Sequence, residues 1–220
     1  MAEGFNIAIL MLAKTGLDEL VQGQQSGKVP CNPSSEAHFF SAWVTRAIKQ
    51  QRFPHCVAKQ LLAWQKAART QGANAGLKPI FEQICATYQP LVDASSNMAA
   101  VSSTQLEQLF AALDEHDWYV ERGYPVSRKV THHTDGKASL VVCSEQWQQS
   151  IDANTGTLIK PLSVYARGDV SQLIHVAYQH GLLLHKITDY KSLVKYHGEF
   201  IIYPNNAGTI LAQLQTPSQG

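Results

Sequence analysis

The hydrophobic pattern of the sequence changes once, near Trp118, and this change most limits the folds that the chain can adopt. Before it, apolar residues recur at intervals of three and four, which is the spacing of one helix face. After it, short apolar runs alternate with turn residues such as Gly and Pro. We therefore expect an α+β protein with two domains, a helical domain over residues 1–117 and a small α+β domain over residues 118–220.

The first 117 residues predict a bundle of about five helices. The run Ile7–Ala13 is apolar all round, which predicts a buried helix over residues 5–21. Ser34 is the expected N-cap of the second helix. The spacing T-x-x-E from Thr104 to Glu107 fits a capping box for the last helix.

The second and third helices are separated only by a break at Phe53-Pro54. A proline ends the preceding helix, and so short a connection predicts antiparallel neighbours. Each helix carries an apolar stripe, so the two should share a core. That core is expected to include Trp43, Val57, Leu61 and Trp64.

The last hundred residues predict short strands around one amphipathic helix. Asp169 is the expected start of the helix over residues 170–180, and Gly181 is expected to end it. Together they predict a β-α-β-β run. Strands are expected over residues 139–143, 158–166, 182–187 and 199–203.

Charge is unevenly distributed along a chain that is nearly neutral overall. The formal net charge is +1, so no global charge indicates nucleic acid or an anionic membrane as the partner. Residues 37–78 nevertheless contain seven Lys or Arg residues and no acid, whereas residues 79–121 contain seven Asp or Glu residues and no Lys or Arg.

The basic block allows two interpretations. It can form a surface that contacts nucleic-acid phosphates, since Lys59 and Lys66 share a helix face. It can instead pack against the acidic helices that follow it, which we favour because the two blocks are equal in charge. The nucleic-acid interpretation would use Arg46, Lys49, Arg52, Lys59, Lys66 and Arg69.

No catalytic residue, metal ligand or cofactor site is assigned from the sequence. His132, His133 and Asp135 are of types that bind zinc, but Asp135-Gly136 predicts a turn, and adjacent strand residues point to opposite faces. The histidines of the last third could supply a general base, yet no nucleophile motif accompanies them. We therefore expect no bound metal and no cofactor.

Cysteine usage and hydropathy predict a cytoplasmic protein. The spacings between Cys31, Cys56, Cys85 and Cys143 match neither a zinc pair nor a redox pair. The longest strongly apolar run is Ile7–Ala13, far short of the ~20 residues that cross a membrane. No membrane association is expected.

The segment from His38 to Ile84 resembles a family of uncharacterised gammaproteobacterial proteins, domain of unknown function 2913. The shared pattern is an aromatic-x-x-Trp helix that runs into Arg-Phe-Pro and is followed by a Leu-Leu helix ending at an Arg and a Gly. The resemblance implies a bacterial protein, often encoded among accessory or mobile genes, and implies no activity. The matching residues are Phe40 to Trp43, Lys49, Arg52-Phe53-Pro54, Val57-Ala58, Leu61-Leu62, Arg69 and Gly72.

Three functions remain open from the sequence. The first is a non-enzymatic accessory protein that binds a protein partner. The second is a nucleic-acid-binding protein that uses the basic hairpin of residues 46–78. The third is an enzyme with a histidine-based site in the C-terminal half. An apolar patch would favour the first, an exposed basic hairpin the second and a deep pocket with converging His, Asp or Cys the third.

Overall fold

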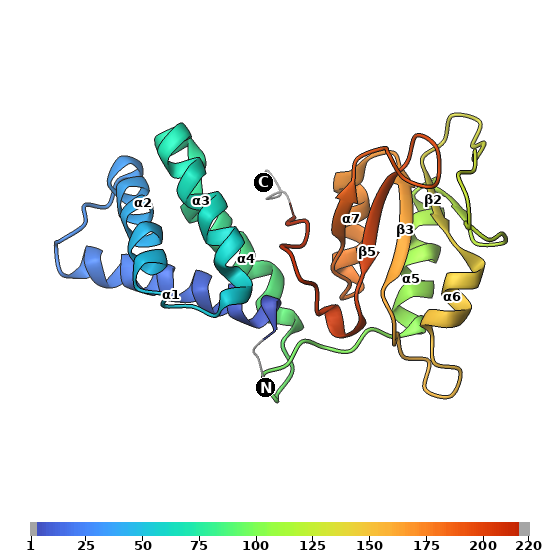
Figure 1. Cartoon of the computed structure of the whole chain (residues 1–220), viewed down its shortest axis with the longest axis horizontal. Helices are drawn as coiled ribbons and strands as arrows, with labels where there is room; N and C mark the ends of the chain where they lie inside the picture. The colour runs from blue at the N-terminus through green and yellow to red at the C-terminus, as the bar shows by residue number, and fades with distance from the viewer. Residues whose placement is uncertain (1–3, 216–220) are drawn as a thin grey trace. The chain divides into compact units, whose positions relative to one another are not determined.

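The computed structural model describes residues 4–215, and the chain divides into two compact units, residues 1–97 and 98–220 (Figure 1). The α+β class is confirmed, because helices dominate the N-terminal half and a five-stranded sheet lies in the C-terminal half. The division falls after residue 97 rather than after residue 117, because the helix of residues 103–115 packs within the second unit.

The first unit consists of four α-helices and short 3-10 turns. Asn32 caps the second helix, since its side chain accepts a 2.9 Å hydrogen bond from the backbone N–H of Ser35. The predicted cap at Ser34 is therefore wrong: Pro33 suits the first helical turn, and the helix begins there. The helices are α1 (Phe5–Gln25), α2 (Pro33–Lys49), α3 (Ala58–Gln71) and α4 (Leu77–Tyr88).

Phe81 on α4 lies at the centre of the first core. Its ring centroid is 5.0 Å from that of Phe40, 5.8 Å from that of Trp43 and 4.9 Å from that of Trp64. On α1, a Cβ added to Gly16 would lie 2.8 Å from the Phe81 ring, so glycine lets the two helices approach closely. The core of this unit is thus a cluster of aromatic rings from α2, α3 and α4 against α1.

The second unit is a mixed sheet with two helices on one face. The strand order is β1-β2-β3-β5-β4; β1 and β2 are parallel and the other pairs are antiparallel. The strands are β1 (Tyr119–Glu121), β2 (Ser139–Val142), β3 (Leu162–Arg167), β4 (His185–Thr188) and β5 (Gly198–Ile202), and the helices are α5 (Ser103–Glu115), α6 (Ser144–Ser150) and α7 (Val170–Gln179).

The α5 and α7 helices pack side by side against the sheet (Figure 1). On α5, Leu109 and Leu113 are fully buried in one cluster with Val164 of β3 and Phe200 of β5. The opposite face of the sheet is covered by connections, since Val126 and Val194 pack there against strand residues. The predicted β-α-β-β run is confirmed as β3, α7, β4 and β5.

The α5 helix begins two residues earlier than its predicted capping box. Ser102 is the N-cap, and its side chain and that of Gln105 form the reciprocal bonds of a capping box. The box expected from Thr104 to Glu107 is therefore wrong. Bonds to the 151–158 turn hold the chain extended at Ser102, which leaves Thr104 inside the helix.

Candidate functional site

The α2–α3 hairpin has the antiparallel arrangement that the sequence predicts. Gln65 Nε2 on α3 donates a 3.2 Å hydrogen bond to Thr45 Oγ1 on α2. Further along α2, Ile48 lines a groove between the two helices together with Leu62, which precedes Gln65 on α3. The α2 and α3 helices therefore run in opposite directions. The four residues expected in the shared core, Trp43, Val57, Leu61 and Trp64, are all buried.

Five of the six predicted cationic residues are exposed and make no ion pair with any residue that the structure describes. These are Arg46, Lys49, Lys59, Lys66 and Arg69. On α3, three of them fall at intervals of seven and three residues, so they form one stripe on the solvent face. The hairpin therefore presents cations on both of its helices.

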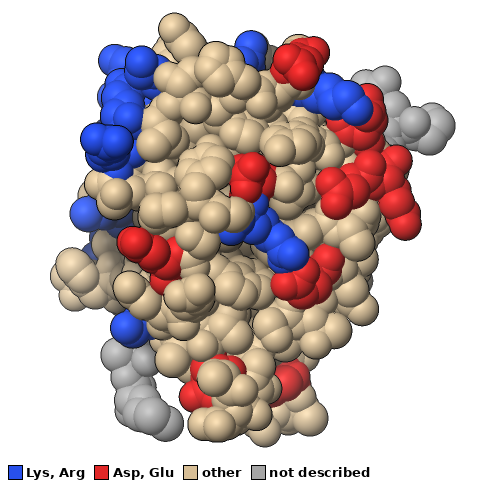
Figure 2. Space-filling view, turned by 90° about the vertical axis from the view of Figure 1, so that its right-hand side faces the viewer, with Lys and Arg blue, Asp and Glu red and all other residues tan. Residues whose placement is uncertain are grey.

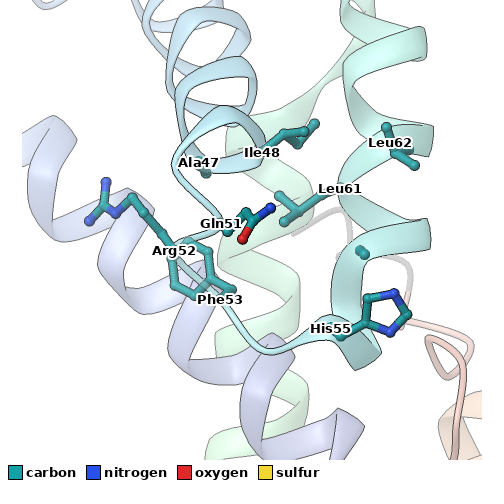
Figure 3. Close-up of a pocket in the computed structure, with 9 residues that line it drawn as sticks. Ala47, Ile48, Gln51, Arg52, Phe53, His55, Leu61 and Leu62 are labelled. Carbon is teal, nitrogen blue, oxygen red and sulfur yellow. The ribbon is translucent and has the colours of Figure 1, made fainter.

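Arg52, the sixth predicted residue, has a structural role. Its guanidinium donates a 2.5 Å hydrogen bond to Glu19 on α1 and lies 5.6 Å from the ring centroid of Trp43. The hydrogen bond from Arg52 lowers the pKa of the Glu19 carboxyl. Arg52 lines the pocket drawn in Figure 3, where its guanidinium extends to the side opposite Leu62. Lys78, at the end of the basic block, pairs with Glu36 at 2.9 Å.

An open apolar groove lies between the C-terminal half of α2 and the start of α3 (Figure 3). Its volume is about 400 Å³. Ile48 and Leu61 point into the gap between the helices, and Leu62 at the edge has 52% of its surface exposed. Gln51 and His55 supply polar groups at one end. On α3, the exposed Lys59 and Lys66 lie three residues before and four residues after Leu62, so cations lie beside this edge of the apolar surface.

The acidic run of residues 107–121 belongs to the second unit, whereas the basic hairpin belongs to the first. Within the described residues the acidic run forms local ion pairs: Glu107 pairs with Arg122, and Asp117 pairs with Lys137. The acids that neutralise the basic block within its own unit are instead Glu19, Glu36 and Glu82. Figure 2 shows the side of the molecule that lies on the right in Figure 1, and on this face Lys and Arg side chains gather at the upper left while Asp and Glu side chains lie mostly at the centre and right.

The candidate metal ligands of the second unit do not converge. Among residues 4–215, no group of three or more His, Cys, Asp or Glu side chains could hold one metal ion. Asp135 and Gly136 have φ values of 48° and 86°, so the predicted turn is present. His132 instead contacts Tyr124, whose hydroxyl lies 3.1 Å from His132 Nδ1.

Ser139 and His197 form a buried pair that the sequence does not reveal. His197 Nδ1 lies 2.8 Å from the carbonyl of Lys195, which can only accept, so the ring nitrogen carries the proton there. His197 Nε2 then accepts a 2.7 Å hydrogen bond from the Ser139 hydroxyl. Burial lowers the pKa of His197, which favours this neutral ring. Both residues have 0% exposed surface, so the hydroxyl is closed to a substrate, and the pair holds β5 to β2.

A family model described as protein of unknown function (DUF2913) matches residues 4–215. The chain belongs to this family. The match covers both units, so the aromatic helix and the Arg-Phe-Pro break that line the groove lie in the same family region as the sheet. No curated protein and no solved structure matches the chain. None of the helices in the described part combines the length and apolarity that a membrane span requires.

Proposed function

We propose that this member of the DUF2913 family is a non-enzymatic binding module whose α2–α3 groove takes an acidic, apolar segment of a partner protein. The observation that carries the proposal is the open, mainly apolar groove of about 400 Å³, with exposed cations beside Leu62 at its edge on α3. A groove of this kind suits a segment that inserts an apolar side chain and places carboxylates at the edge.

The apolar part supplies the affinity. Leu62 keeps about half of its surface exposed on a helix whose other large apolar residues, Leu61 and Trp64, are buried. Covering this exposed half of the leucine removes apolar surface from water and contributes about 0.8–1.5 kcal/mol, half of the value for burying a whole leucine. Leu62 is therefore the proposed anchor of the contact, at the edge of the groove on α3.

The charged part supplies the preference for an acidic partner. Lys59 and Lys66 lie three residues before and four residues after Leu62, so they flank it on the same face of α3. Neither makes an ion pair with a described residue, which leaves both free to pair with carboxylates. Rim charges of this kind steer encounter and reject basic partners more than they add affinity.

The test is a titration of the full chain with a labelled helical peptide that has Leu on one face and Glu on the others. We expect Leu62→Ser to weaken binding about tenfold, since the anchor contact is lost. Val21→Ser is the matched control, because Val21 on α1 is 47% exposed and lies outside the groove. Equal binding of a peptide with Lys in place of Glu would contradict the proposal.

Nucleic-acid binding by the same hairpin is the second candidate, because five exposed cations lack acidic partners in the described structure. Binding of a random duplex at about 0.15 M salt, lost when Lys59, Lys66 and Arg69 are changed to Gln, would make it the leading function. Lys28→Gln, an exposed lysine before α2, is the control for charge alone. A cytoplasmic location is part of the proposal, since the exposed thiol of Cys31 suits a reducing compartment.

A further inference from the structure

The connection between β4 and β5 forms a small hairpin with an unusual surface. Lys191 and Lys195 form an antiparallel bridge, and Ser192 closes the tip by accepting from the Val194 N–H and donating to its carbonyl. Tyr190 and Tyr196, just outside the bridge, are 67% and 70% exposed. They are the most exposed of the large apolar and aromatic side chains in the described structure.

A second basic segment lies against this hairpin. The Val130 N–H donates to the Leu193 carbonyl, and the Lys195 N–H donates to the Val130 carbonyl, each at 2.9 Å. Val130 and Val194 pack inward against the sheet. Because alternate residues of extended chain point to opposite sides, Lys129 and Lys195 are directed outward.

These two segments form a cationic surface without acids of its own. Residues 128–131 and 190–196 together contain four Lys or Arg residues and no Asp or Glu. All four are exposed and make no ion pair with a residue in the described range: Arg128, Lys129, Lys191 and Lys195. The nearest acid along the chain, Asp189, pairs with Lys186.

The bridge also places two like charges directly opposite each other. Lys191 and Lys195 are cross-strand partners, a pairing that destabilises a hairpin in the absence of an anion. A phosphate between the two ammonium groups would relieve that repulsion. The exposed tyrosine rings beside them make no ring contact with a described residue, so their faces are free to stack.

We propose that the surface formed by residues 128–131 and 190–196 binds single-stranded nucleic acid. Lysines that track phosphates beside aromatic rings that stack on bases are the two components of such sites. A single strand fits better than a duplex because the bases of a duplex are stacked on one another and cannot reach Tyr190 or Tyr196. This inference is independent of the α2–α3 groove, which lies in the other unit.

The experiment is a fluorescence anisotropy titration of the full chain with labelled oligo(dT), oligo(U) and a random duplex. We expect both single strands to bind more tightly than the duplex. Tyr190→Ala should weaken single-strand binding at least about fivefold, whereas Tyr190→Phe should preserve it, since the ring stacks and the hydroxyl is not needed. Tyr190 is exposed, so neither change should lower the melting temperature.

Salt dependence tests the phosphate contacts separately. Changing Lys191 and Lys195 to Gln should reduce the slope of log K against log salt by about 1.4, because each phosphate contact of a single strand contributes about 0.7. Lys160→Gln is the control. Lys160 is exposed and precedes the N-terminal end of β3, whereas the hairpin lies next to the C-terminal end of that strand. A triple change of Lys59, Lys66 and Arg69 to Gln should leave single-strand binding unchanged.

Three results would overturn the proposal. The first is equal affinity for duplex and single strand. The second is loss of binding in the α2–α3 triple variant but not in Tyr190→Ala. The third is no binding of oligonucleotides together with Tyr190-dependent binding to phosphatidylserine vesicles, which would show that the tyrosines and lysines face a membrane surface.

Discussion

The carboxylate of Glu19 accepts a hydrogen bond from Arg52, which lies 33 residues further along the chain, through one oxygen, and from the Trp43 indole N–H, at 2.8 Å, through the other. The carboxylate therefore ties α1 both to α2 and to the break that joins α2 to α3. It also withdraws Arg52 from the set of cations that a ligand could use. The remaining cations lie on the solvent side of the hairpin.

A double-mutant cycle between Glu19 and Arg52 should show a favourable coupling. We expect about 0.5–1 kcal/mol, because both side chains are about 30% exposed and such pairs are partly screened by solvent. Urea unfolding of Glu19→Ala, Arg52→Ala and the double variant measures it. Since ion pairing lowers the pKa of Glu19, this coupling should be lost as the pH falls through that lowered value. A coupling of zero at pH 7 would contradict the structural role given to Arg52.

Trp64→Ala should strongly destabilise the first unit. The ring has only 4% of its surface exposed and packs 4.9 Å from Phe81, so its removal leaves a cavity beside the central ring. We expect a loss of about 3–5 kcal/mol in the free energy of unfolding. Leu62→Ala on the same helix, at an exposed position, should cost much less. Similar losses for the two variants would show that Trp64 does not occupy the core.

Stability should fall as the pH is lowered from about 6.5, the pKa of an unperturbed histidine, toward 4. Burial lowers the pKa of His185 to about 4, so in this window the unfolded chain binds a proton that the folded chain does not. The expected loss is about 3 kcal/mol. His185→Asn, whose amide can still donate to the Ile210 carbonyl, should flatten the profile. His197 and His132, whose pKa values burial also lowers, should leave a smaller slope in the same direction. An unchanged profile in His185→Asn would refute the assignment.

The boundary between the units can be tested with two fragments. We propose that residues 98–220 form a domain that folds alone, whereas residues 118–220 do not. The shorter fragment lacks α5 and so loses Leu106, Leu109, Phe110 and Leu113 from the core of the sheet. Circular dichroism and amide dispersion in NMR spectra distinguish the two. A folded 118–220 fragment would restore the boundary that the sequence predicts.

Local patterns were enough to predict the elements that depend on one helix face or one cap. The stripes around Phe53-Pro54 placed Trp43 and Trp64 in a shared core, where both are buried. Asp169 was expected to start a helix, and its side chain accepts from two backbone N–H groups, those of Ser171 and Gln172. In each case the signal is local, either the periodicity along one helix or the residues of one cap.

Features that depend on distant parts of the chain could not be predicted in this way. The stripe on α5 shows that the helix is buried but not against which elements, and the structure packs it against the sheet in the compact unit of residues 98–220. The capping box lies two residues before the predicted one because the backbone N–H of Ser103 bonds to the carbonyl of Gly156, which is 53 residues further along the chain. The Ser139–His197 pair spans 58 residues and has no local signal.

The candidate surfaces show the same limit. The basic block is evident from the sequence. Only the structure shows that Arg52 and Lys78 form ion pairs, whereas Lys59 and Lys66 are exposed and unpaired among the described residues. The groove forms where Ile48 of α2 meets Leu61 of α3, and that meeting depends on the register between the two helices. An equal number of charges favoured pairing of the two blocks within the chain, yet the described ion pairs of residues 107–121 are with Arg122 and Lys137.

The binding account is tested most directly by photo-crosslinking in the native cell, with a photoreactive phenylalanine analogue in place of Leu62 or, as a control, Val21. We predict crosslinks from position 62, and not from position 21, to protein segments rich in Asp and Glu. These crosslinks should become weaker and lose their preference for acidic segments when Lys59, Lys66 and Arg69 are changed to Gln. Crosslinks to nucleic acid, equal labelling from both positions, or no labelling from position 62 would contradict the account.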